Sequence, residues 1–280
     1  MKPADFEYHA PDDLDALLAL LAQHGEEGKI LAGGQSLVPV MNFRLARPPH
    51  LIDLNGVADL DFLRAEESVV RIGALTRHAA FHRPVVAGPT GKLLSEVVPY
   101  IAHYPIRTRG TFAGSIAHAD PASEWCVIVR LLEAEIVARS RRHERRLKAA
   151  EYFQGTFATA LSPQEVITEV RLPLLDASWR TGFYEFSRRA GDFAIAMTAV
   201  ALRTVGNKIT EARIAVGGVE DRPMRMASAE ALLMQGAAPA EAARAVAAAV
   251  KPMEDIHADA AYRRDLVIAT TQRALERALA

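Results

Sequence analysis

The sequence is poor in cysteine: its 280 residues include one, Cys126. A single thiol cannot form an internal disulfide. Nor can it supply an iron–sulfur cluster or a thiolate zinc site within this chain alone, because both need several cysteines. Cys126 lies in the apolar run 125–129, so we expect a buried thiol at this position.

The sequence also lacks an excess of charge and any long apolar run. The net charge of −1 argues against a general nucleic-acid role. No run approaches the ~18 apolar residues that a membrane span needs, so we expect no transmembrane segment. Residues 1–7 have neither a basic start nor an apolar core, so we expect no secretory signal. These absences favour a cytoplasmic location, or attachment to the inner membrane through partners.

The composition is otherwise that of an ordinary globular protein, with 50% hydrophobic and 24% charged residues. Helical and strand-like patterns alternate along the chain, which predicts an α+β fold. We expect three units, residues 1–56, 57–176 and 177–280, with a linker at 173–178. Expected strands cover 29–32, 51–54, 69–72, 136–138, 166–170, 182–186, 199–202 and 214–216. Expected helices cover 11–24, 40–43, 93–102 and 121–132, and alanine-rich helices run from 228 to the end with a break at 252.

Several boundaries have local signals. Asp12 and Asp13 favour the start of the first helix. Thr76 is expected to cap a helix that follows it, and Asp120 to cap one that opens at the next residue. Gly206 with the asparagine after it predicts a turn between two strands.

Two loops of small residues carry the clearest functional signal. One covers 32–39, after the expected strand at 29–32, and the other covers 111–115, about eighty residues later. Small residues let a backbone approach a ligand closely and aim N–H donors at it, which suits a diphosphate. The pair therefore predicts one elongated ligand held from two sides. The glycine pair alone is more often a plain turn, and the spacing matches neither the dinucleotide fingerprint nor a phosphate loop.

Other polar residues have two interpretations each. His118 and Asp120 would share a face of a strand, but with no third ligand near we expect no metal site. Glu124 either stabilises a helix start or accepts hydrogen bonds from a ribose or an adenine. The basic run 139–146 is either a solvated hairpin tip or a docking patch for an acidic partner. No nucleophile arrangement appears, so we expect a chain that holds a cofactor and contains no catalytic residue.

Five ordered motifs resemble one family. They are Ala32-Gly33-Gly34-Gln35-Ser36-Leu37-Val38-Pro39, Arg109-Gly110-Thr111-Phe112-Ala113-Gly114-Ser115, Phe186-Ser187-Arg188-Arg189-Ala190-Gly191-Asp192-Phe193-Ala194, Val216-Gly217-Gly218-Val219 and Asp255-Ile256-His257-Ala258-Asp259-Ala260-Ala261-Tyr262-Arg263-Arg264. Over nearly its whole length the chain resembles the medium, FAD-binding subunit of molybdenum hydroxylases, the group of aerobic carbon monoxide, xanthine and nicotine dehydrogenases.

The resemblance implies a fold and a cofactor site. The first two units would form the two-part FAD-binding domain of the vanillyl-alcohol-oxidase-like (PCMH) type. The third would be a C-terminal domain with a small antiparallel sheet and helices. The residues implied to bind FAD are Ile30, Leu31, Ala32, Gly33, Gly34, Gln35, Ser36, Leu37, Ile101, Thr111, Phe112, Ala113, Gly114, Ser115, Glu124, Ile167 and Tyr184.

The resemblance also implies an electron-transfer role. A large partner would hold the molybdopterin cofactor and a small partner the 2Fe-2S clusters, in a dimer of heterotrimers. Electrons would pass from those clusters through FAD in this chain to an external acceptor. A self-sufficient FAD oxidoreductase acting directly on a small substrate is the alternative. A scaffold that has lost FAD is a third, because Ala113 and Ser115 replace a glycine and a polar residue of the family pattern.

Two positions bear on whether the chain binds FAD. An alanine at 113 costs little if its φ is negative and strains the loop if its φ is positive. Tyr184 stands where some relatives have lysine, and it is either a core aromatic or a residue that lies on the flavin ring.

Overall fold

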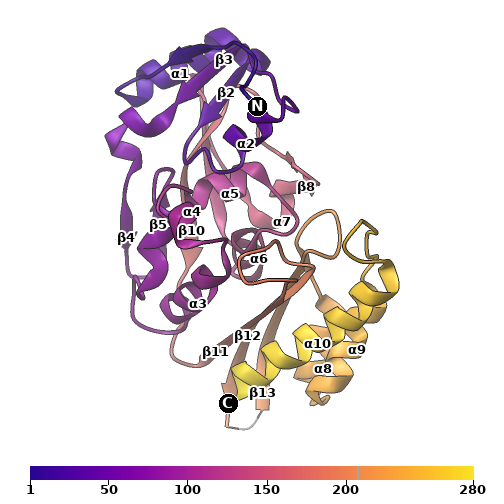
Figure 1. Cartoon of the computed structure of the whole chain (residues 1–280). Helices are drawn as coiled ribbons and strands as arrows, with labels where there is room; N and C mark the ends of the chain where they lie inside the picture. Colours follow the sequence, from indigo (N-terminus) through magenta and orange to yellow (C-terminus); the bar gives the residue numbers. More distant parts are fainter. Residues whose placement is uncertain (207) are drawn as a thin grey trace.

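The computed structural model describes residues 1–206 and 208–280, which form three larger sheets, one two-stranded sheet and their helices (Figure 1). The fold is α+β, as predicted. Each sheet lies within one of the three expected units, and the division at 56/57 and 176/177 remains a prediction.

The first unit is a small parallel sheet with two helices. Strands β1 (Glu7–His9), β3 (His50–Asp53) and β2 (Gly28–Leu31) are hydrogen-bonded in the order β1-β3-β2. The helices are α1 (Leu14–His24) and α2 (Leu37–Asn42). Helix α1 buries Leu17, Leu18 and Leu21, the positions that helical periodicity predicts. It starts three residues later than expected because Asp13 is its cap and accepts a hydrogen bond from the Ala16 amide at 2.7 Å.

The second unit is a five-stranded antiparallel sheet, in the order β4-β5-β10-β6-β7. The strands are β4 (Leu63–Ala65), β5 (Val69–Gly73), β10 (Val166–Pro173), β6 (Glu135–Arg139) and β7 (Glu144–Lys148). The helices are α3 (Pro89–Val97), α4 (Tyr104–Arg107), α5 (Phe112–His118), α6 (Glu124–Leu131) and α7 (Ala149–Tyr152), followed by a hairpin of β8 (Phe153–Gly155) and β9 (Ala158–Thr159). Phe81, Phe112 and Trp125 form its aromatic centre, with ring centroids 4.8–5.4 Å apart.

Two capping predictions in this unit are wrong. The Thr76 hydroxyl donates to the carbonyl of Phe62, at 2.6 Å, and caps no helix. Helix α6 begins at Glu124 with Ser123 as its cap. Asp120 instead accepts a hydrogen bond from the Ala122 amide at 2.8 Å, which makes a separate turn.

The third unit is a four-stranded antiparallel sheet covered on one face by helices. Its strands are β11 (Trp179–Phe186), β12 (Ala196–Val205), β13 (Lys208–Gly217) and β14 (Met224–Arg225). Helices α8 (Ala227–Met234), α9 (Pro239–Ala249) and α10 (Ala260–Leu279) cover the face that carries Val200 and Ile214 (Figure 1). The opposite face, with Phe183 and Ala199, joins the core of the second unit. The expected turn at 206–207 falls partly outside the described residues.

Candidate cofactor site

The two small-residue loops meet backbone to backbone. The first follows β2, and its last residues, 37–39, already belong to α2. The second loop, taken as the motif 109–115, enters α5: Thr111 caps this helix and residues 112–115 form its first turn, so the prediction of a loop at 111–115 is wrong. A Cβ atom on Gly33 would lie 2.3 Å from the Arg109 carbonyl oxygen and 2.6 Å from the Gly110 Cα. Gly33 therefore permits a contact between the first two units that a side chain would prevent. Gly34 has a φ of 71°, a conformation that glycine adopts without strain.

Hydrogen bonds from Arg77 and Asn55 join the two loops. The Arg77 guanidinium donates to the Arg109 carbonyl oxygen and, at 2.5 Å, to Asn55 Oδ1. Asn55 Nδ2 in turn donates to the Ala32 carbonyl oxygen at 2.9 Å. Sequence analysis missed this connection, because it depends on which strand ends become neighbours in the folded protein.

Most amides of the second loop already have protein partners. The Phe112 amide donates to the Thr76 carbonyl oxygen at 3.0 Å, and the Gly114 amide to Thr111 Oγ1 at 3.0 Å. The Ser115 amide donates to the Thr111 carbonyl oxygen at 3.2 Å. These three amides are therefore already occupied, and the loop offers a ligand close approach and side-chain hydroxyls more than free amides.

The substitution at position 113 is accommodated without strain. Ala113 lies inside α5, its φ is not positive, and its side chain is buried. An alanine there follows the helical backbone at little cost. The structural reason for inferring a scaffold that has lost its cofactor is therefore absent at this residue.

Glu124 is one of two buried carboxyl groups where the second and third units meet. It is the first residue of α6, and burial raises its pKa to about 7, with a further increase from Asp120. Glu185, on β11, has its pKa raised to about 9 by burial and by Glu124. Its Oε2 atom is buried without a hydrogen-bond partner in the described structure. The raised pKa favours the protonated form of Glu185, which can donate a hydrogen bond.

The other expected FAD contacts lie in three different environments. Ile101 is buried, and its carbonyl oxygen accepts from Arg107 Nη1 at 2.8 Å. Ile167 is buried on β10, where the pairing with β6 shifts register. Tyr184 lies on the α10 side of β11: its hydroxyl contacts Arg273, and both Arg273 and Arg277 lie 4.8 Å over its ring. The structure therefore brings the two loops together and places Tyr184 against α10.

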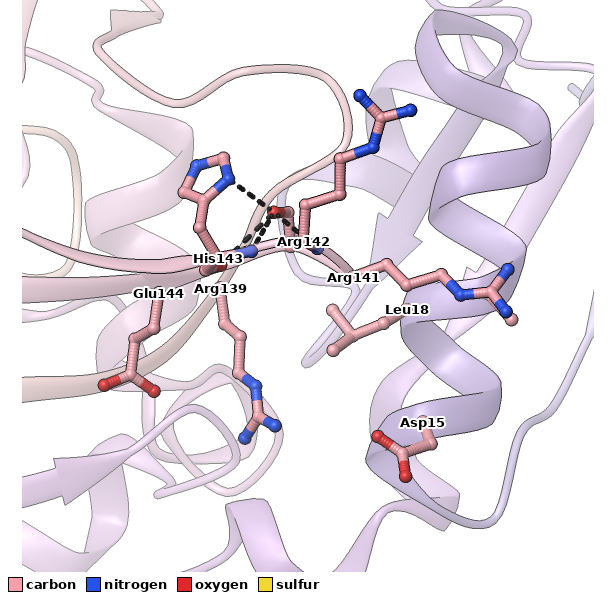
Figure 2. Close-up of a pocket in the computed structure, with 9 residues that line it drawn as sticks. Asp15, Leu18, Arg139, Arg141, Arg142, His143 and Glu144 are labelled. Atoms are coloured by element: carbon pink, nitrogen blue, oxygen red, sulfur yellow. Dashed lines mark hydrogen bonds between the residues drawn. The ribbon is translucent and has the colours of Figure 1, made fainter.

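The basic run forms the hairpin between β6 and β7, as one interpretation predicted. A groove of about 710 Å³ lies between this hairpin and α1, lined by Asp15, Leu18, Ala19 and residues 139–144. Figure 2 shows the guanidinium groups of Arg139, Arg141 and Arg142 spreading apart from the tip. Nearby, Arg145 binds the buried Glu165 carboxylate at 2.7 Å. These positions favour a solvated tip anchored by one internal ion pair.

The prediction that His118 and Asp120 share a strand is wrong. His118 is the last residue of α5, and its ring lies 4.8 Å from that of Phe157. The structure instead groups His9, His24 and His50, which sequence analysis missed. They are far apart in the sequence, and only the pairing of β1 with β3 and the position of α1 bring them together.

None of the described helices is both long and apolar enough to cross a membrane. The buried thiol of Cys126 is confirmed, and burial raises its pKa.

Comparison with known proteins matches nearly the whole chain to two domain families. The family described as "FAD binding domain in molybdopterin dehydrogenase" matches residues 4–175. The family described as "CO dehydrogenase flavoprotein C-terminal domain" matches residues 181–278.

Individual relatives align with this chain over nearly their full length. The chain is 39% identical to the 6-hydroxypseudooxynicotine dehydrogenase complex subunit alpha of Paenarthrobacter nicotinovorans, covering 100% of this chain and 96% of the relative. It is 36% identical to the carbon monoxide dehydrogenase medium chain of Hydrogenophaga pseudoflava, covering 100% and 99%. A solved structure of carbon monoxide dehydrogenase from that organism, lacking the Mo-pyranopterin moiety of its cofactor, superposes with a TM-score of 0.94 at 37% identity, covering 100% and 99%.

Proposed function

Because this chain belongs to the family of FAD-binding medium subunits of molybdenum hydroxylases, we propose that it passes electrons from iron–sulfur clusters of a partner subunit through FAD to an external acceptor. The observation that carries the proposal is the contact of Gly33 with Gly110, which brings the two loops together. The two-loop site would hold the FAD diphosphate from both sides.

The residues present fit this cofactor. Gly33 lets the first loop pack against Arg109 and Gly110, and Gly34 turns the backbone at a φ of 71°, so the two loops lie close enough to bind one diphosphate between them. The Ser36 hydroxyl makes no capping bond in α2 and is able to donate to a phosphate oxygen. Arg77 donates to the Arg109 carbonyl oxygen and Asn55 to the Ala32 carbonyl oxygen, so both loop oxygens already have partners and need not face the phosphates unpaired. FAD, when bound, supplies the capacity to take up and release one or two electrons.

The remaining residues implied to bind FAD are proposed to contact parts of the cofactor beyond its diphosphate. Ile101 and Ile167 are buried apolar residues able to pack against it. Glu124 is positioned by the start of α6 to accept a hydrogen bond from a hydroxyl or an amine. Tyr184 remains a proposed contact, although its ring lies beside Arg273 and Arg277.

Other subunits are part of the proposal. One buried cysteine leaves no thiolate set for a cluster in this chain, so the 2Fe-2S clusters belong to a small partner. A large molybdopterin subunit would bind and oxidise the substrate. We propose a dimer of such heterotrimers in the cytoplasm, with any attachment to the inner membrane made through partners. No catalytic residue is assigned to this chain.

An absorption spectrum of the complex, purified gently from its host, tests the proposal. The expected result is flavin bands with added iron–sulfur absorbance and two co-purifying chains. Flavin bands from a lone polypeptide that oxidises a small substrate would contradict it and support a self-sufficient flavoenzyme.

A further inference from the structure

Three histidine side chains meet on one face of the first sheet. His9 is on β1, His50 is on β3 and His24 ends α1. One ring nitrogen of each lies within 4.8 Å of the others, and His9 Nε2 is 3.1 Å from His50 Nδ1. The rings of His24 and His50 lie 3.8 Å apart, centroid to centroid.

The strand register produces this group. Glu7 pairs with His50 across β1 and β3, so their side chains share a face. His9 is two residues after Glu7 and lies on the same face. Helix α1 ends at His24 and places it beside these residues. A Cβ atom on Gly28 of β2 would lie only 3.1 Å from the His24 Cβ. The absence of a side chain at Gly28 thus gives His24 its place.

One nitrogen of the group has no partner. His24 Nε2 is buried and accepts or donates no hydrogen bond within the described structure. Leaving a buried polar atom unpaired costs roughly 1–3 kcal/mol, so such atoms call for an explanation.

We propose that His9, His24 and His50 bind one divalent transition-metal ion of the type that prefers imidazole, with Zn²⁺ as the probe. At Zn–N distances of about 2.0–2.1 Å, two tetrahedral ligands lie about 3.3 Å apart, close to the observed His9–His50 separation. The exposed Glu7 carboxylate, 3.5 Å from His50 Nδ1, or a water molecule supplies the fourth ligand.

The metal site is at the opposite end of the sheet from the cofactor loops. His50 starts β3, and the first loop follows the far end of the neighbouring parallel strand β2. Strand β3 from His50 to Asp53 spans about 10 Å at about 3.3 Å per residue. The ion would tie β1 and the end of α1 to β3, and its loss would leave the FAD site intact.

The test is metal binding by the full chain, prepared without a polyhistidine tag. Zinc content is measured by mass spectrometry after dialysis against ZnCl₂, and coordination from the visible spectrum of the CoCl₂-loaded protein. We expect about one Zn²⁺ per chain, tetrahedral Co²⁺ bands and a higher unfolding temperature with metal than with chelator.

Variants show whether the three histidines are the ligands. His9→Gln and His24→Gln should each weaken Zn²⁺ binding about tenfold or more and remove the metal-dependent shift, while FAD content stays unchanged. His257→Gln, at an exposed histidine outside the group, should bind like the wild type. Wild-type zinc content equal to that of the double variant His9→Gln/His24→Gln would overturn the proposal. Since His9 lies on an edge strand, its variant remains informative if His24→Gln fails to fold.

Discussion

Gly33 and Gly110 lie so close that a Cβ atom on Gly33 would be 2.6 Å from the Gly110 Cα. These residues belong to the two loops that carry the family's motifs, in two units with separate sheets. The proposed cofactor site therefore depends on both units together, so a change at Gly33 should affect stability and FAD binding at once.

Gly33→Ala should lower the free energy of unfolding by about 1–3 kcal/mol and reduce FAD content, because the added methyl group collides with the second loop. Chemical denaturation and flavin absorbance measure the two effects. Gly155→Ala is the matched control, since its Cβ would meet nothing closer than 3.5 Å. Equal unfolding free energies and equal FAD contents in the two variants would show that the close contact at Gly33 affects neither stability nor FAD binding.

Arg77→Met should loosen the loops without filling space between them. It removes the guanidinium donors to Arg109 and Asn55, which contribute roughly 1–3 kcal/mol as charged hydrogen bonds. We expect weaker FAD retention on gel filtration and a lower unfolding temperature. Arg83→Met, at an exposed arginine, should change neither, and unchanged retention in Arg77→Met would refute the role given to this side chain.

Glu185→Gln should stabilise the protein increasingly as the pH rises. Burial holds the folded pKa of Glu185 at about 9, above its ordinary value, so the folded state binds a proton that the unfolded chain has lost. The stability of the wild type therefore falls as the pH rises from the ordinary carboxyl pKa to the folded pKa of Glu185. A glutamine at this position removes that loss. Unfolding curves at pH 5 and pH 8 measure it, with a gain of about 1 kcal/mol or more expected at pH 8 only. Glu151→Gln, at an exposed site, should show no such gain.

Arg145→Met should destabilise the protein at neutral pH by about 1–3 kcal/mol. Burial alone would raise the pKa of Glu165, but its hydrogen bonds to Arg145 hold that pKa at about 2. The stabilisation is present above the ordinary carboxyl pKa and is lost as the pH falls toward 2. Denaturation at pH 7 and pH 3 follows the change. Arg142→Met, at the exposed tip of the same hairpin, should leave stability unchanged at pH 7 and at pH 3, as expected for a solvated tip.

The sequence predicted the features that depend on neighbouring residues. The periodicity of Leu14, Leu17, Leu18 and Leu21 gave α1, and Asp13 marked its start. The motifs at 32–39 and 109–115 predicted two segments that approach each other, and they do so at Gly33 and Gly110; that they bind one ligand remains a prediction. Thr76 and Asp120 were misassigned because each hydroxyl or carboxylate found a different partner, chosen by the tertiary fold or a local turn.

The sequence could not predict features that depend on how distant parts of the chain pack or pair. Arg77 reaches Asn55 and Arg109 only after two units have packed together. His9 and His50 are 41 residues apart and become neighbours through the parallel pairing of β1 and β3. Such pairings follow from the energy of the whole fold and leave no local pattern.

The amount of FAD released from the purified complex tests the central claim most directly. We expect one non-covalently bound FAD per copy of this chain, measured by chromatography after denaturation, and a clear deficit in the Gly33→Ala complex. A wild-type complex without FAD, or with unchanged FAD in that variant, would contradict it.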